Sequence, residues 1–252
     1  GDHRDLHYPL RRQRQMCIRD RTGAGAPTGI TVYEGKLLPK RYWNQLIHCE
    51  SGVNVVRAYP IKDDGAGYKA GSIEVMKSVD DRSFRPIDVA VAPDGSLFIS
   101  DWYDPVVGGF QQRDIARGRL YRIAPKGSKY INPKLGFETA LEASEALKNP
   151  NYCVRYEAWK KLHKMGNAAE EALLKLYHSS DSRIKARALW LLGKCKGREQ
   201  FYVNMALKDE DPDIRIIAIR LARQTNIPII EVLQKISNDP SPKVRRECAI
   251  SL

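Results

Sequence analysis

The apolar and polar positions of the chain follow two different periods, one in each half. From residue 22 to about residue 127, short runs rich in Val, Ile, Tyr and Phe are bounded by Gly, Pro, Asp and Asn, which is typical of β-strands. Further along, apolar residues recur at spacings of three and four, the period of an amphipathic helix. The pattern predicts a β domain over 22–127, a linker over 128–140 and a helical domain over 141–252.

Six runs in the first half are predicted to be strands. The clearest pair is a hairpin in which Val89 and Val91 alternate with alanines, residues 93–95 (Pro-Asp-Gly) supply the turn, and Leu97 and Ile99 return. Short antiparallel strands at this spacing indicate a sandwich, a barrel or propeller blades. The six runs are 29–35, 44–50, 52–61, 71–78, 86–102 and 118–127.

An internal repeat with a period of 30 residues runs through the second half. Each copy has an N-cap residue, an aliphatic residue three positions later, a basic residue directly after it, and a small residue four positions after the aliphatic one. Such helix pairs cannot bury their apolar faces alone, so neighbours stack into an α-solenoid. The positions are Asn151, Asp181, Asp211 and Ser241 for the caps; Val154, Ile184, Ile214 and Val244; Arg155, Lys185, Arg215 and Arg245; and Ala158, Ala188, Ala218 and Cys248. A companion helix in each pair is marked by Leu173, Leu176, Val203, Ala206, Leu233 and Ile236.

The repeated basic residues have two interpretations. Each is placed to reach an Asp in the next inter-repeat loop, which predicts a structural ladder. Alternatively they form a basic face for nucleic acid. Acidic residues such as Asp209, Asp211 and Asp239 interleave with the bases and make nucleic acid the less favoured partner.

The formal net charge of +12 is partly carried by the basic head, residues 1–21. Back-translation of "MCIRDR" permits ATG TGT ATA AGA GAC AG, which resembles the transposon end of a sequencing library. The preceding "RRQRQ" and "GDHRDLH" fit the adjoining parts of the same oligonucleotide in order. The head is therefore expected to be a disordered tail translated from adapter, and its six Arg and three Asp contribute +3 of the total. On this interpretation the chain is an interior fragment, truncated at both ends.

The sequence lacks the motifs of several kinds of functional site. The five cysteines are scattered, and neither C-x-x-C nor the haem-attachment motif C-x-x-C-H occurs. No run of about 18 apolar residues is present, so no membrane span is expected. A metal site is not predicted.

A family resemblance rests on "FRPIDVAVAPDGSLFISDWYDPVVGG" (84–109) followed by "RDIARGRLYRI". These segments resemble the closing blades of bacterial membrane-bound dehydrogenase proteins, whose propeller is similar to soluble quinoprotein glucose and sorbosone dehydrogenases. The 30-residue pattern resembles short HEAT repeats. The resemblance implies a partial β-propeller followed by a HEAT-like solenoid. For the intact protein it implies a quinone cofactor, calcium and a C-terminal c-type haem domain beyond this chain. It also implies a periplasmic or other extracytoplasmic location.

Charged and aromatic residues inside or beside the predicted strands are the candidate cofactor-binding residues, because a buried charge is costly unless it is bonded. Arg85, Asp88 and Asp101 either face a ligand site at the propeller channel or rim, or form an inter-blade salt bridge and cap strand turns. The six candidates are Arg85, Asp88, Asp101, Trp102, Asp104 and Arg113. The catalytic residues stay unknown, because the family's catalytic His is on a blade absent here; His48 is interpreted as a half-buried His at a strand end, and Cys49 as a core residue.

Two main functions follow. The chain is either part of an exported enzyme that oxidises a sugar or alcohol and passes electrons to a haem domain, itself inactive as a fragment, or part of a non-enzymatic scaffold. In the second case the helical repeats bind a protein or glycan partner.

Overall fold

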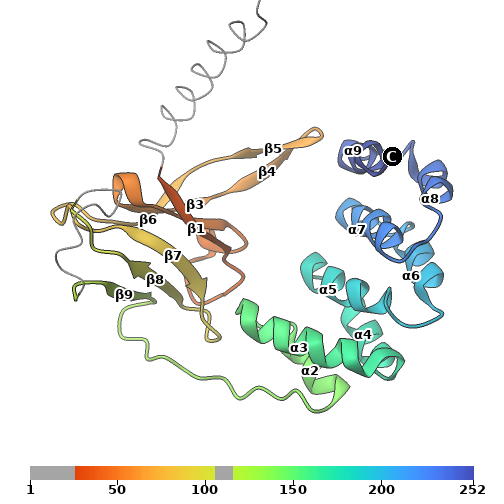
Figure 1. The fold of residues 1–252 in the computed structure, drawn as a ribbon, viewed down its shortest axis with the longest axis horizontal. Coiled ribbons are helices and arrows are strands. Elements are labelled where there is room, and N and C mark those ends of the chain that lie inside the picture. The colour runs from red at the N-terminus through yellow and green to blue at the C-terminus, as the bar shows by residue number, and fades with distance from the viewer. Residues whose placement is uncertain (1–25, 106–115) are drawn as a thin grey trace, which may run out of the picture. The chain divides into compact units, whose positions relative to one another are not determined.

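The computed structural model describes residues 26–105 and 116–252 of the chain (Figure 1). The predictions for the head, residues 1–21, and for Arg113 lie outside the described residues. The chain divides into two compact units: one comprises residues up to Ile61 together with Ala70–Tyr130, and the other comprises Lys62–Lys69 together with Ile131–Leu252. The prediction of a β-rich part followed by a helical part is confirmed.

The β part contains three antiparallel sheets, none of them closed into a barrel in the described residues. The four-stranded sheet has the order β1-β2-β3-β6, the three-stranded sheet has the order β7-β8-β9, and β4 pairs with β5. The strands are β1 (Pro27–Val32), β2 (Leu46–Glu50), β3 (Val55–Tyr59), β4 (Ile61–Asp64), β5 (Gly67–Ala70), β6 (Ile73–Lys77), β7 (Pro86–Val91), β8 (Leu97–Asp101) and β9 (Arg119–Ile123). Two 3₁₀ turns, Lys40–Tyr42 and Ser51–Val53, interrupt the first sheet's connections.

The predicted hairpin is confirmed as β7 and β8. Val89 pairs with Ile99 and Val91 with Leu97, and all four side chains are buried. Gly95 closes the turn with a φ of +87°, a backbone conformation that residues with a Cβ rarely adopt.

One core connects the four-stranded and three-stranded sheets. Tyr33 is completely buried, its hydroxyl donates to the Gly95 carbonyl at 2.7 Å, and it accepts from the Leu38 amide at 2.8 Å. The Thr28 and Ser51 hydroxyls both donate to the carbonyl of Pro86 at the start of β7. These three hydroxyl groups are therefore hydrogen-bonded, as burial requires.

The helical part is a two-row stack of antiparallel pairs (Figure 1). Each pair contributes one helix to each row, and helices α3, α5, α7 and α9 pack in succession in one row. The elements are α2 (Ala140–Ala146), α3 (Tyr152–Met165), α4 (Glu170–Tyr177), α5 (Ser182–Leu192), α6 (Glu199–Ala206), α7 (Pro212–Gln224), α8 (Ile229–Ile236) and α9 (Pro242–Ser251). None of the helices in the described ranges combines the length and apolarity that a membrane crossing needs.

The predicted helix starts coincide with the caps. The side chains of Asn151, Asp181 and Asp211 accept hydrogen bonds from backbone amides of the first turns of α3, α5 and α7. Ser241 is the N-cap residue of α9, as predicted, but its side chain makes no cap hydrogen bond. Pro242 at the first helical position still favours a helix start there.

The stacked pairs share one continuous core. The repeated small residues Ala158, Ala188 and Ala218 are fully buried, as are Ile214 and Val244 of the aliphatic series. All six residues predicted to mark the companion helices are buried in the same core. A Cβ at Gly193 would lie 2.2 Å from the Leu221 side chain, so a glycine is needed where α5 approaches α7.

The predicted ladder of basic residues is confirmed at two positions. Lys185 Nζ lies 3.0 Å from Asp209 Oδ2, and Arg215 makes a bidentate pair with Asp239 at 2.7 and 2.8 Å. Arg215 Nη1 also donates to the carbonyls of Asp209 and Glu210, which lie in the loop before its own helix. Arg215 therefore connects two successive inter-repeat loops, and Lys185 connects its helix to the loop that precedes α7.

Candidate functional site

Asp101, at the end of β8, is the most enclosed of the sequence-predicted residues. Its side chain is completely buried. Oδ1 accepts from the backbone amides of Arg85 at 2.7 Å and Tyr103 at 3.0 Å, and Oδ2 accepts from Arg119 Nε at 2.6 Å. These three hydrogen bonds offset the cost of burying the charge.

Arg119, the residue that organises this end of the sheet, was missed by the sequence analysis. Its guanidinium bridges Asp101 and Asp81, with Nη1 2.6 Å from Asp81 Oδ2, and lies over the rings of Tyr103 and Tyr121 at 4.7 and 5.5 Å. The Arg119 hydrogen bond holds the pKa of Asp81 below its ordinary value. The available signal was the charged first residue of the run "RLYRI", which faces the end of "LFISD" in an antiparallel pair.

The other candidate residues lie near the end of β8 but do not form one cluster. Arg85 is buried and its Nε has no hydrogen-bond partner among the described residues. Asp104 is also buried, with its backbone amide bonded to the Ser83 carbonyl. Trp102 is 51% exposed, and Asp88 is an exposed residue whose carboxylate accepts from the Val89 amide. A ligand-binding role for these residues stays a prediction.

His48 and Cys49 of β2 lie where the sequence analysis expected them. His48 is half-buried beside the Tyr59 ring, and burial lowers its pKa below the ordinary value. Cys49 is completely buried, which raises the pKa of its thiol to about 12. Such a thiol is a core group rather than a nucleophile.

The calcium ion that the family resemblance implies has no cluster of acidic side chains to hold it in residues 26–105 and 116–252. No group of three or more His, Cys, Asp or Glu side chains in these ranges is arranged to hold a metal ion. The Asp101 carboxylate, which is completely buried, already accepts three protein hydrogen bonds.

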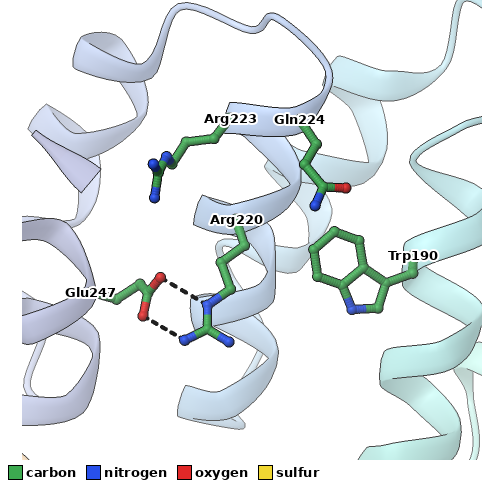
Figure 2. Close-up of a pocket in the computed structure, with 5 residues that line it drawn as sticks. All are labelled: Trp190, Arg220, Arg223, Gln224 and Glu247. Atoms are coloured by element: carbon green, nitrogen blue, oxygen red, sulfur yellow. Dashed lines mark hydrogen bonds and ion pairs between the residues drawn. The ribbon is translucent and has the colours of Figure 1, made fainter. Parts of the chain in front are cut away.

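A second candidate site lies in the helical part, on the exposed side of α3, α5, α7 and α9, which we call the odd-helix face. An open cavity of about 480 Å³ occurs there, lined by side chains from three successive helices (Figure 2). These are Trp190 of α5, Arg220, Arg223 and Gln224 of α7, and Glu247 of α9. Trp190 and Arg220 occupy equivalent positions in successive 30-residue repeats, so stacking alone places them side by side.

Arg220 and Glu247 form the fixed part of this cavity (Figure 2). Arg220 Nε and Nη2 each lie 2.8 Å from a Glu247 carboxylate oxygen, a bidentate geometry that holds the guanidinium plane in place. The Glu247 side chain is 3% exposed and that of Arg220 is 50% exposed. The Arg220 hydrogen bond lowers the pKa of Glu247 and outweighs the opposing effect of burial. The carboxylate therefore stays ionised and the guanidinium stays oriented.

Arg223 and Gln224 form the adaptable part of the cavity lining. Arg223 is exposed and has no hydrogen bond or ion pair within the part of the chain that the structure describes. In Figure 2 the Gln224 amide points toward the Trp190 indole ring. The cavity is thus lined by two guanidinium groups, one amide, one aromatic ring and a single carboxylate.

The odd-helix face continues onto α3 with a row of aromatic rings. Tyr152, Tyr156, Trp159 and His163 lie in sequence along the helix, and each ring is near-parallel to the next, with centroids 4.8 to 6.5 Å apart. Tyr152 is 70% exposed and Tyr156 is 49% exposed. Exposed aromatic rings of this kind, rimmed by charged residues, are typical of interaction surfaces.

The fold and the two sites define a protein with an antiparallel β region followed by stacked repeat helix pairs that carry an aromatic and basic face. Residues 3–127 match a family model described as a domain of unknown function (DUF7133), which covers the β part. The match includes most of the head that resembles translated adapter, so that interpretation stays a prediction. No curated protein matches the chain.

Proposed function

We propose that the chain is part of a binding scaffold, in which propeller-type blades are followed by HEAT-type repeats, and that the odd-helix face binds a protein partner. The observation that carries the proposal is the open cavity on α5, α7 and α9, together with the exposed aromatic row of α3. Stacked repeats present extended surfaces of this kind, because each helix pair adds the same positions to one face.

The residue types on the face support a protein partner. Trp, Tyr and Arg contribute most of the binding energy at protein interfaces, because they combine a large contact area with directional hydrogen bonds. Trp190, Tyr156 and Arg220 supply these three types from three neighbouring helices. A glycan could also stack on such rings, and its binding is an outcome of the test below.

The β-region candidates support a structural role for that part. The Asp101 carboxylate is completely engaged by the sheet, and Arg122 of β9 likewise forms an ion pair with Asp94 in the β7–β8 turn, at 2.9 Å. Charges committed in this way stabilise the edges of the sheet and leave fewer groups for substrate chemistry.

Selection of displayed random peptides on the full chain tests the proposal. Recovered peptides should lose affinity for Trp190→Ala and Tyr156→Ala, which truncate the odd-helix face. They should bind Phe201→Ala normally, because this exposed aromatic residue lies on α6 in the other row. If the peptides bind all three variants alike, or if only oligosaccharides on a glycan array respond to the first two variants, the proposed function is wrong.

A second proposal is that the protein containing this chain oxidises a sugar or alcohol outside the cytoplasm and passes electrons to a haem domain. The motif "PIDVAVAPDGSLFISDWYD" supports it through the family resemblance, with Trp102 as an exposed ring beside the strand end. Sequencing of the genomic locus is the test. Upstream blades carrying a catalytic His and a downstream C-x-x-C-H motif are expected, and a locus lacking both would refute it.

A further inference from the structure

We infer that the cavity between Trp190, Arg220 and Arg223 receives an acidic side chain, so that the partner segment bound by the odd-helix face is an acidic peptide. The inference rests on the proposed function and specifies the partner's chemistry. The charged groups that line the cavity are two guanidinium groups and one carboxylate. They leave an excess positive charge in a site that is open to solvent.

The hydrogen-bonding groups left over in the cavity are donors. The Glu247 carboxylate occupies Nε and Nη2 of Arg220 and leaves Nη1 without a hydrogen bond among the described residues. Arg223, three residues later on α7, contributes a whole guanidinium. Residues three apart on a helix are neighbours on its surface, and both guanidinium groups line the cavity. The unbonded N–H groups of either one can donate to the oxygens of an incoming carboxylate.

Glu247 acts here as a positioning residue. Without it, the long Arg220 side chain would have to be immobilised when the ligand binds, at a cost in side-chain entropy. The bidentate pair fixes the guanidinium plane beforehand. The Trp190 ring provides an apolar wall for the methylene groups of a glutamate side chain, and the Gln224 amide is within the same lining.

A peptide fits this face better than a nucleic acid does. Nucleic-acid binding uses many phosphate contacts along a continuous basic groove. Here the basic groups alternate with carboxylates: Lys243 lies 2.9 Å from Asp213, Lys160 lies 2.8 Å from Glu157, and Arg220 is bonded to Glu247. These acidic groups would repel a continuous phosphate chain but leave room for a single carboxylate at the cavity.

Fluorescence anisotropy with the full chain tests the inference. The probe is a fluorescein-labelled twelve-residue peptide in which glutamate alternates with alanine, and the matched probe has glutamine in place of glutamate. We expect the glutamate peptide to bind with an affinity that falls as salt rises, and the glutamine peptide to bind at least about fivefold more weakly. Arg223→Ala should weaken the glutamate peptide by about fivefold or more, and Arg223→Lys should restore part of the affinity.

The control variant is Lys235→Ala, which removes one exposed positive charge from α8 in the other row. It should leave binding unchanged, and thermal melting should show that every variant is folded. Equal binding of the two peptides, no binding of the glutamate peptide, or an equal effect of Lys235→Ala and Arg223→Ala would each overturn the inference. So would tighter, Arg223-dependent binding of a twelve-residue oligothymidylate, which would identify a nucleic-acid site.

The two proposals fail in distinguishable ways. Displayed peptides that require Trp190 but contain no acidic residues would refute the acidic-partner inference and leave the proposed function intact. Peptides that ignore the odd-helix face altogether would refute the proposed function itself.

Discussion

The ion pair between Arg215 and Asp239 should contribute more to the stability of the helical part than any exposed pair on its surface. Arg215→Met keeps most of the side-chain volume and removes the guanidinium. It breaks two charge-assisted bonds to Asp239 and two bonds to the carbonyls of Asp209 and Glu210. The Arg215 and Asp239 side chains are only 12% and 5% exposed, so the carboxylate left behind is poorly solvated.

The expected magnitude follows from comparison with Arg245, which occupies the same repeat position one pair later. Arg245 Nη1 donates to the carbonyls of Asp239 and Pro240 but has no carboxylate partner among the described residues. Loss of two such bonds should cost about 1 to 2 kcal/mol. Breaking a buried ion pair from one side costs about 3 to 5 kcal/mol. Both variants lose two bonds to carbonyls, so Arg215→Met should exceed Arg245→Met by the cost of the ion pair, about 3 to 5 kcal/mol.

Urea unfolding followed by far-ultraviolet circular dichroism measures both variants against the unmodified chain. The midpoint should move while the slope stays constant, because the exposed area on unfolding is nearly unchanged. The double variant Arg215→Met/Asp239→Asn should recover part of the loss, since no uncompensated charge remains. Equal destabilisation by Arg215→Met and Arg245→Met, or no recovery in the double variant, would refute the assigned role of the ladder.

Three further changes test other parts of the structure. In the β part, Arg119→Met should destabilise by about 3 kcal/mol in urea unfolding, because Asp101 would keep its burial and lose its cation; a change below about 1 kcal/mol would contradict that role. For pH, the folded-state pKa of Glu247 lies below its unfolded value of about 4.3, so its contribution to stability is present above that pH and disappears as the pH falls through the folded-state pKa. The acid-induced loss in stability should be smaller in Glu247→Gln, and identical pH profiles would be inconsistent with this. Finally, iodoacetamide followed by mass spectrometry should label the exposed Cys153 in the folded chain and spare Cys49, whose pKa is about 12; early labelling of Cys49 would show that the β core is open.

The helical part was predictable because several independent signals share its 30-residue period. The caps at Asn151, Asp181 and Asp211, the buried alanines and the basic residues all recur in phase. The ladder could be predicted as well, since an Asp follows Lys185 and Arg215 by the same 24 residues. Periodic features of this kind report the packing directly.

The β4–β5 hairpin and the cavity could not be predicted in the same way. The hairpin, Ile61–Ala70, has only exposed or half-buried side chains, so no hydrophobic alternation marks it. The cavity residues are separated by up to 57 positions, from Trp190 to Glu247, and meet only through the register of α5, α7 and α9. Alignment of the repeats places Trp190 and Arg220 at one equivalent position, which is the signal that could have revealed them. Arg119 was missed because its partners, Asp81 and Asp101, lie in different segments.

The indole N–H resonances of the tryptophans offer the most direct test of binding through the odd-helix face. The chain contains four, of which Trp159 and Trp190 lie on α3 and α5 and Trp43 and Trp102 lie in the β part. On titration with the alternating glutamate peptide, a ¹H–¹⁵N spectrum should show the Trp190 resonance moving most, while the Trp43 and Trp102 resonances stay in place. Saturable movement of Trp43 or Trp102 with Trp190 unchanged would contradict the account.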